Sequence, residues 1–218
     1  MAYKRLEAIA SLIRENEKVL DVGTDHGLVP IFLLKRGVTQ VADASDIADG
    51  PLAIARKNIQ NEGFENNINL YKSNGLESIE YKNYDSIIVA GMGGSLIADI
   101  IKPFNGRYIL HATNNHEAVR KQLSKLNFKI TQEFIVKERK VSNIIIVAEK
   151  STWLKSRICK YNQLVGPELK KVNDMEVDMY YKEQLEHFVN IHSKSNNKDH
   201  KRRAMSFGKV LVWREKNL

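Results

Sequence analysis

From about residue 18 to residue 150, short apolar runs alternate with segments of helical pattern. Helix-sized connections between strand-sized runs indicate parallel strands joined by crossover helices. This alternation is typical of a doubly wound α/β sheet with helices on both faces. Strands are expected at residues 18–23, 40–46, 68–73, 84–90 and 107–113, and helices at 30–37, 51–63, after Gly94 and at 116–126.

The rhythm changes near residue 128. Residues 128–138 and 141–150 are two strand-like runs, and only a short basic turn at Arg139 and Lys140 separates them. Because so short a connection cannot cross over a sheet, these runs predict an antiparallel hairpin. We therefore expect five parallel strands followed by an antiparallel pair.

After Lys150 the strand pattern stops and a helical pattern begins. A polar break at residues 193–198 separates two helical stretches, the second at about 199–215, which predicts a helical hairpin. We expect Met175, Met179 and Phe207 to form its core. The residues that recur at helical spacing in the first stretch are Leu169, Val172, Met175 (or Glu176), Met179, Leu185, and Phe188 or Val189. The sequence thus predicts domains at 1–150 and 151–218.

Most of the excess positive charge lies in this tail. Residues 151–218 hold 14 of the 34 basic residues but only 8 of the 26 acidic ones, so they carry +6 of the net charge of +8. Such a tail is either a solvated lysine-rich surface or a surface that binds a polyanion, where clustered cations displace phosphate counterions.

Several classes of protein are disfavoured. No apolar run approaches the roughly 18 residues of a membrane span, and the first residues show an amphipathic pattern rather than a signal sequence. The single Cys159 excludes an internal disulfide and a multi-cysteine zinc site, and the histidines are scattered. We expect a cytoplasmic protein with no metal and no membrane partner.

The ends of the predicted parallel strands carry the residues suited to chemistry. The first strand runs into Asp21-Val22-Gly23-Thr24-Asp25-His26-Gly27, whose glycines let backbone amides approach a ligand. The spacing is neither G-x-G-x-x-G nor a phosphate-binding G-K-[ST] loop, which disfavours a dinucleotide-binding fold and a nucleoside triphosphatase. The second strand ends at Asp46, where an acid can accept hydrogen bonds from ribose hydroxyls.

Two further strand ends extend this pattern. The third strand ends near Asn74, whose side-chain carbonyl can accept from an adenine amino group, and the fourth ends in Ala90-Gly91-Met92-Gly93-Gly94. Each feature also has a structural explanation: Asp46 as a helix cap, Asn74 as a turn residue, the glycines as packing spacers. Their occurrence at successive strand ends favours a pocket for an adenosine with a charged tail.

These motifs make the chain resemble the bacterial tRNA (adenine(22)-N(1))-methyltransferase family over nearly its whole length. The resemblance implies a Rossmann-like class I methyltransferase sheet with a helical, coiled-coil-like C-terminal domain, S-adenosyl-L-methionine as cofactor and tRNA as substrate. The matching stretches are Arg5-Leu6 with Ile9-Ala10, LDVGTDHGLVPI (Leu20–Ile31), SDIADGPL (Ser45–Leu52), NGL (Asn74–Leu76), IIVAGMGG (Ile87–Gly94) and VGPELKK (Val165–Lys171).

The sequence also departs from the family. Asn74 stands where the family usually has Asp, only Asn114 remains of a usual Gln-Pro-Asn, and Ser142-Asn143-Ile144 replaces Tyr-Glu-Ile. An amide oxygen at position 74 can still accept a hydrogen bond, without charge. These departures bear on the target base rather than on the cofactor pocket.

For the cofactor, we expect Asp46 to hold the ribose, Asn74 the adenine edge, and Asp21 the methionine end together with two glycines. The expected cofactor-binding residues are Asp21, Gly23, Thr24, Gly27, Asp46, Ile47, Asn74, Gly75, Leu76, Ala90 and Gly91.

For catalysis, Met92 and Gly93 are expected against the transferring methyl group and the target base. Asp25 and His26 are candidates to hold or relay a proton there, although His26 can equally cap a helix. Asn114 can orient the target amino group or serve as an ordinary turn residue.

The partner is expected to be tRNA, bound by a monomer. The cations expected to contact its phosphates are Arg5, Lys170, Lys171, Lys201, Arg202 and Arg203. The alternatives are a methyltransferase acting on another RNA or on a small molecule, and a non-catalytic RNA-binding protein on the same scaffold. An NAD-dependent oxidoreductase is disfavoured by the glycine spacing and the closing hairpin.

Overall fold

The computed structural model describes residues 4–151 and 157–218. Its core is a seven-stranded sheet of order β3-β2-β1-β4-β5-β7-β6, in which the first five strands are parallel and β7 pairs antiparallel with β5 and β6. The predicted sheet is confirmed, with β7 inserted between β5 and β6. The strands are β1 (Val19–Val22), β2 (Ala42–Asp46), β3 (Leu70–Lys72), β4 (Ser86–Met92), β5 (Arg107–Ala112), β6 (Phe128–Glu138) and β7 (Val141–Lys150).

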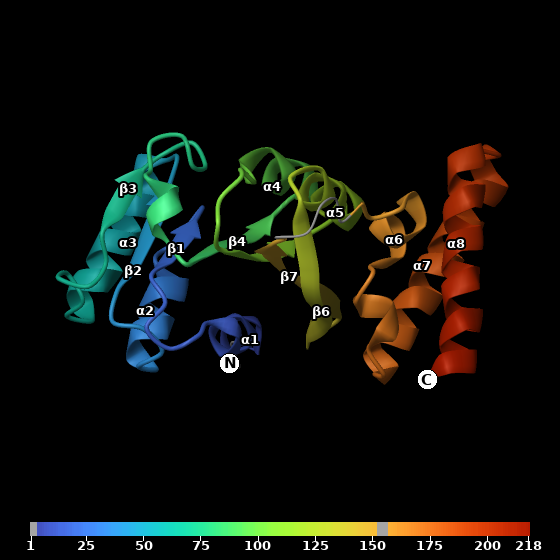
Figure 1. Ribbon diagram of the computed structural model, residues 1–218, viewed down its shortest axis with the longest axis horizontal. Coiled ribbons are helices and arrows are strands. Elements are labelled where there is room, and N and C mark those ends of the chain that lie inside the picture. Colours follow the sequence, from blue (N-terminus) through green and yellow to red (C-terminus); the bar gives the residue numbers. More distant parts are fainter. Residues whose placement is uncertain (1–3, 152–156) are drawn as a thin grey trace.

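Helices cover both faces of the sheet (Figure 1). Alternating side chains of the central strand explain why: Ile87 and Val89 pack with α4 and α5, whereas Ile88 packs with α1 and α2. The helices before the tail are α1 (Lys4–Leu12), α2 (Leu28–Lys35), α3 (Asp49–Asn61), α4 (Gly94–Ile100) and α5 (His116–Lys125), with a 3-10 turn η1 (Tyr81–Asn83).

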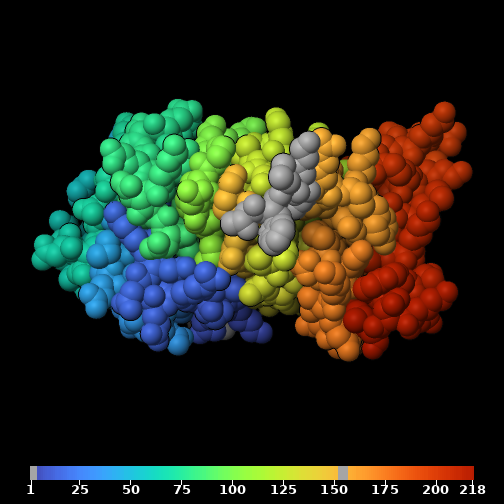
Figure 2. All heavy atoms as spheres, viewed as in Figure 1, coloured from blue at the N-terminus to red at the C-terminus, as the bar shows by residue number. Residues whose placement is uncertain are grey.

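The tail forms one end of the molecule and packs against the sheet (Figures 1 and 2). Its buried side chains, among them Tyr181 and Phe207, belong to the same apolar cluster as β4, α4 and α5. The predicted helical hairpin is confirmed as α7 and α8. The tail elements are α6 (Lys160–Val165), the 3-10 turn η2 (Leu169–Lys171), α7 (Met175–Ser195) and α8 (Lys198–Asn217).

Three details of the tail correct the sequence predictions. Leu169 and Val172 lie before α7, because Asp174 caps that helix by accepting a hydrogen bond from the Glu176 backbone N–H (2.8 Å). Met175, expected in the core, is 73% exposed, and Met179 is also exposed. The helix α6 was not predicted.

Within the described residues, no helix is long and apolar enough to cross a membrane.

Candidate active site

The carboxyl ends of the parallel strands meet where β1 lies between β2 and β4, the point at which the strand order reverses. Backbone hydrogen bonds hold these ends together. The N–H groups of Gly23 and Thr24 donate to the Ser45 carbonyl (both 2.8 Å), and Ser73 donates to the Asp46 carbonyl (2.9 Å). Four turns that are far apart in sequence thus share one edge of the sheet, as the sequence predicted.

The turn after β1 favours glycine at its first position. Gly23 has a φ of 73°, and a Cβ placed there would lie 1.7 Å from the Met92 methyl group. Met92, which ends β4, therefore covers the β1 turn closely. Gly27, at φ 71°, packs against Ala55 of α3 and precedes the first turn of α2. Of the expected set, the structure brings Gly23 and Met92 together.

The acids at this edge differ in environment. Asp21 is buried, and its burial raises its pKa to about 6; the neighbouring Thr24 side chain opposes the shift and the charge of Asp46 adds to it. Asp25 is exposed, and its Oδ1 lies 3.2 Å from His26 Nε2. Asp25 and His26 thus form a pair at the surface of the β1 turn.

The turns after β2 and β3 present acceptors beside an apolar side chain. Asp46 Oδ1 accepts a hydrogen bond from the Ala48 backbone N–H (2.8 Å), which fixes the carboxylate, and Ile47 beside it is 61% exposed. Asn74 Nδ2 donates to Glu77 (3.2 Å), which leaves its Oδ1 without a partner among the described residues. Leu76, also expected to bind the cofactor, has its side chain in the main core.

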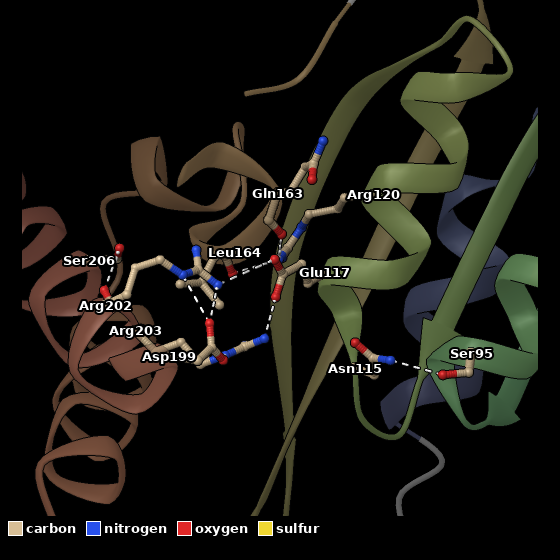
Figure 3. Close-up of polar contacts among 10 residues, drawn as sticks. All are labelled: Ser95, Asn115, Glu117, Arg120, Gln163, Leu164, Asp199, Arg202, Arg203 and Ser206. Carbon is tan, nitrogen blue, oxygen red and sulfur yellow. Dashed lines mark hydrogen bonds and ion pairs between the residues drawn. The ribbon is translucent and has the colours of Figure 1, made fainter. Parts of the chain in front are cut away.

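The turn after β4 packs against the turn after β5. A Cβ on Gly94 would lie 2.4–2.5 Å from the carbonyl oxygens of Asn115 and Asn114, so only glycine fits. Asn114 Oδ1 accepts from the Gly94 N–H (3.2 Å), and Asn115 Nδ2 donates to Ser95 Oγ (2.9 Å; Figure 3). Asn114 therefore positions the glycine turn, a role that the sequence did not indicate.

A buried histidine, which the sequence pattern did not indicate, forms a hydrogen bond with the backbone of Gly91. His111 Nδ1 accepts a hydrogen bond from the Gly91 N–H (3.1 Å), so Nε2 carries the proton and donates to Asn143 Oδ1 (2.9 Å). Asn143 Nδ2 in turn donates to two carbonyls of the β6–β7 hairpin. Burial, followed by the charge of Arg5, lowers the pKa of His111 to about 4, so this histidine is neutral.

Replacing Asn143 by alanine is expected to lower the free energy of unfolding by about 1–3 kcal/mol, because the buried His111 N–H loses its acceptor. Urea unfolding followed by circular dichroism measures this. The neighbouring Ser142→Ala change should stay within about 0.5 kcal/mol. Equal effects of the two changes would contradict the structural role of the His111–Asn143 pair.

The residues at this edge fit a nucleoside that bears an amino-acid tail. Ser45 Oγ is buried without a hydrogen-bond partner in the described part of the chain. Asp46 and Asn74 supply acceptors for a ribose and a base edge, and Ile47 supplies an apolar surface. Within residues 4–151 and 157–218, no group of three or more His, Cys, Asp or Glu is arranged to hold a metal ion.

Most of the basic residues that were expected to bind RNA lie in the tail. Several of them form ion pairs with carboxylates. Arg203 pairs with Asp199 and with Glu117 of α5 (both 2.7 Å), and Arg202 pairs with Asp199 (2.8 Å; Figure 3). Lys171 pairs with Glu168, Lys170 Nζ donates to Asn162, Lys201 is exposed, and the Arg5 backbone N–H donates to Glu138. Of these cations, Arg203 links the tail to α5 most closely.

Comparisons with known proteins agree with this geometry. A family model described as a methyltransferase domain matches residues 2–146. The tRNA (adenine(22)-N(1))-methyltransferase of Bacillus subtilis is 28% identical over 202 residues, which cover 87% of this chain and 83% of that protein. A proposed tRNA methyltransferase of Mycoplasma genitalium is 30% identical over 180 residues, covering 78% of this chain and 80% of that protein.

A solved structure matches the tail as well as the sheet. A proposed tRNA (m1A22) methyltransferase of Streptococcus pneumoniae, in complex with S-adenosyl-L-methionine, superposes with a TM-score of 0.86 at 28% identity. The match covers 97% of this chain and 100% of that structure. The chain therefore belongs to the methyltransferase-domain family, and it is similar over most of its length to bacterial tRNA methyltransferases, among them a tRNA (adenine(22)-N(1))-methyltransferase.

Proposed function

We propose that this chain transfers the methyl group of S-adenosyl-L-methionine to N1 of adenine 22 in tRNA. The observation that carries the proposal is the convergence of the turns after β1, β2, β3 and β4 at one edge of the sheet. The relatives named for this activity support the substrate. We also propose that the protein acts as a monomer in the cytoplasm, where tRNA is modified.

The cofactor supplies an electrophilic methyl group on a sulfonium. Adenine N1 already carries a lone pair, so the protein need not provide a strong base for the transfer. Its task is alignment, which can contribute roughly 7–11 kcal/mol. We assign Asp46 to the ribose, Asn74 to the adenine edge of the cofactor and Asp21 to its methionine end. Methylation leaves the target base cationic, and the Asp25–His26 pair, at 3.2 Å, can take the proton that its amino group releases.

The test combines cofactor titration with methylation of a defined tRNA. Isothermal titration should detect S-adenosyl-L-methionine binding, and mass spectrometry should locate the new methyl group at adenine 22. The same tRNA with guanine at that position is the matched control, which should remain unmodified. If both tRNAs were methylated equally, the target would be another base. If isothermal titration detected no binding of the cofactor, the proposal that this chain is an enzyme would be wrong.

Cofactor affinity is expected to decrease as the pH falls below about 6. A ligand cation near Asp21 favours its ionised form, so binding must release a proton when Asp21, with its pKa of about 6, is still protonated. The dissociation constant should rise up to about tenfold per pH unit below 6. Titration in buffers of different ionisation enthalpy detects the released proton, and Asp21→Asn should abolish this part of the pH dependence.

A further inference from the structure

A groove of about 550 Å³ lies between α6 and α8, outside the strand-end site. Its α8 residues recur at intervals of four, three and four positions, so they share one face of that helix. Helix α6 contributes the opposite wall. The groove is lined by Lys160, Tyr161, Arg202, Ser206, Lys209 and Trp213.

One end of the groove adjoins the turn after β5. Arg202 at this end lies 3.9 Å from Glu117, in the first turn of α5. Glu117 follows Asn114 and Asn115, whose side chains bond the glycine turn of β4 and Ser95. Figure 3 shows Arg202, Glu117 and Asn115 along this path. A chain that occupies the groove can therefore continue toward the candidate active site.

The lining combines positive charge with aromatic rings. None of the six lining residues is acidic, and three are cations. The Lys170 ammonium lies 5.6 Å from the centroid of the Tyr161 ring and 5.3 Å from that of Trp213, and Asn162 holds it by a hydrogen bond of 3.1 Å. One anchored lysine thus contacts both rings, which favours these ring positions before any ligand binds.

Unpaired nucleotides bind to surfaces that combine cations with aromatic rings. Their phosphates pair with the cations, and their bases stack on the rings. We propose that the α6–α8 groove binds an unpaired segment of the tRNA substrate, with a base stacked on Trp213 and phosphates held by Lys160, Arg202 and Lys209. The proposal rests on the proposed function, because that function supplies the RNA.

Stacking contacts and phosphate contacts differ in how the affinity for tRNA depends on salt concentration. The proposal can therefore be tested in the whole chain. Trp213→Ala should weaken tRNA binding by about 5- to 100-fold and leave the dependence of log affinity on log salt unchanged, since stacking releases no counterions. Lys209→Ala should reduce that slope by about 0.7–0.9. Trp213→Phe, which keeps a ring, should restore most of the affinity. Filter binding at several salt concentrations measures all three.

Matched controls lie on the same tail. Val212→Ala changes an exposed residue next to Trp213 but outside the groove, and Lys182→Ala removes a cation of α7 that does not line the groove. Both should leave affinity and slope unchanged. In a Trp153→Phe background, Trp213 is the remaining tryptophan of the sequence, and unlabelled tRNA should quench its fluorescence.

The outcomes separate this proposal from the proposed function. If the unaltered chain methylates adenine 22 but Trp213→Ala binds tRNA as well as the unaltered chain, the groove proposal is wrong and the function stands. Equal losses in Trp213→Ala and Val212→Ala would also overturn it. If the unaltered chain binds tRNA with quenching of Trp213 but methylates nothing, the groove proposal survives and the function fails.

Discussion

Replacing Glu133 by glutamine is expected to lower the free energy of unfolding by about 3–5 kcal/mol, because it leaves the buried Arg120 guanidinium without a counter-charge. Arg120 Nε lies 2.7 Å from Glu133 Oε1, and both side chains are almost fully buried. In a chain of this length each kcal/mol lowers Tm by roughly 2–4 °C, so the expected drop is about 6–20 °C. Thermal unfolding followed by circular dichroism measures it.

The large expected loss of stability also reflects the hydrogen bonds that Arg120 and Glu133 form with backbone groups of the tail. Glu133 Oε2 accepts hydrogen bonds from the backbone N–H groups of Glu168 and Leu169 (2.9 and 3.0 Å). Arg120 Nη1 donates to the carbonyls of Gln163 and Leu164 (3.1 and 3.0 Å; Figure 3). The pair thus joins α5 and β6 to the start of the tail, and its loss frees backbone groups on both sides.

Two controls separate the buried charge from general perturbation. Glu62→Gln removes an exposed pair with Lys35 and should cost under about 1 kcal/mol. The double change Arg120→Met with Glu133→Leu should recover part of the lost stability, because apolar replacements of a buried ion pair are often neutral or better. A cost below about 1 kcal/mol for Glu133→Gln alone would contradict the proposed joint between sheet and tail.

The Arg120–Glu133 ion pair is a contact that the sequence could not reveal. Arg120 and Glu133 are 13 positions apart on different elements, and no local pattern marks them as partners. The motif VGPELKK was recognised only as a resemblance. In the structure, a Cβ on its Gly166, which has a φ of 92°, would lie 2.9 Å from both Arg120 Nη2 and Glu133 Oε2. Glycine is required there because the chain passes directly over the ion pair.

The strand-end site was more accessible to sequence analysis, because the ends of parallel strands necessarily meet at one edge of the sheet. Asp46 and Gly23 could be placed from the strand pattern alone. The His111–Asn143 pair could not, since these residues are 32 positions apart and meet only because β7 inserts beside β5. The same holds for Arg203, whose partner Glu117 lies 86 positions away. Local periodicity predicts elements and their ends, but not which side chains long-range pairing brings together.

Replacing Asp46 by alanine is expected to weaken S-adenosyl-L-methionine binding by about 10- to 150-fold for each ribose hydrogen bond lost, since bonds to a charged acceptor contribute roughly 1.5–3 kcal/mol each. The Ala48 N–H fixes the carboxylate through Oδ1, and Oδ2 has no partner among the described residues. Isothermal titration measures the change. Methylation at saturating cofactor should be affected less than affinity, because the ribose lies away from the reacting methyl group.

The choice of control decides whether the effect belongs to the carboxylate or to the turn. Asp46→Asn can keep the bond to Ala48 but removes the charge, so it isolates the charged contact with the ribose. Asp49→Ala removes a nearby exposed acid that pairs with Lys72 (2.6 Å) and should leave affinity unchanged. If Asp46→Asn bound the cofactor as the unaltered chain does, the charge would be dispensable. If Asp49→Ala weakened binding equally, the effect would come from the net charge of this edge, and the ribose assignment of Asp46 would be wrong.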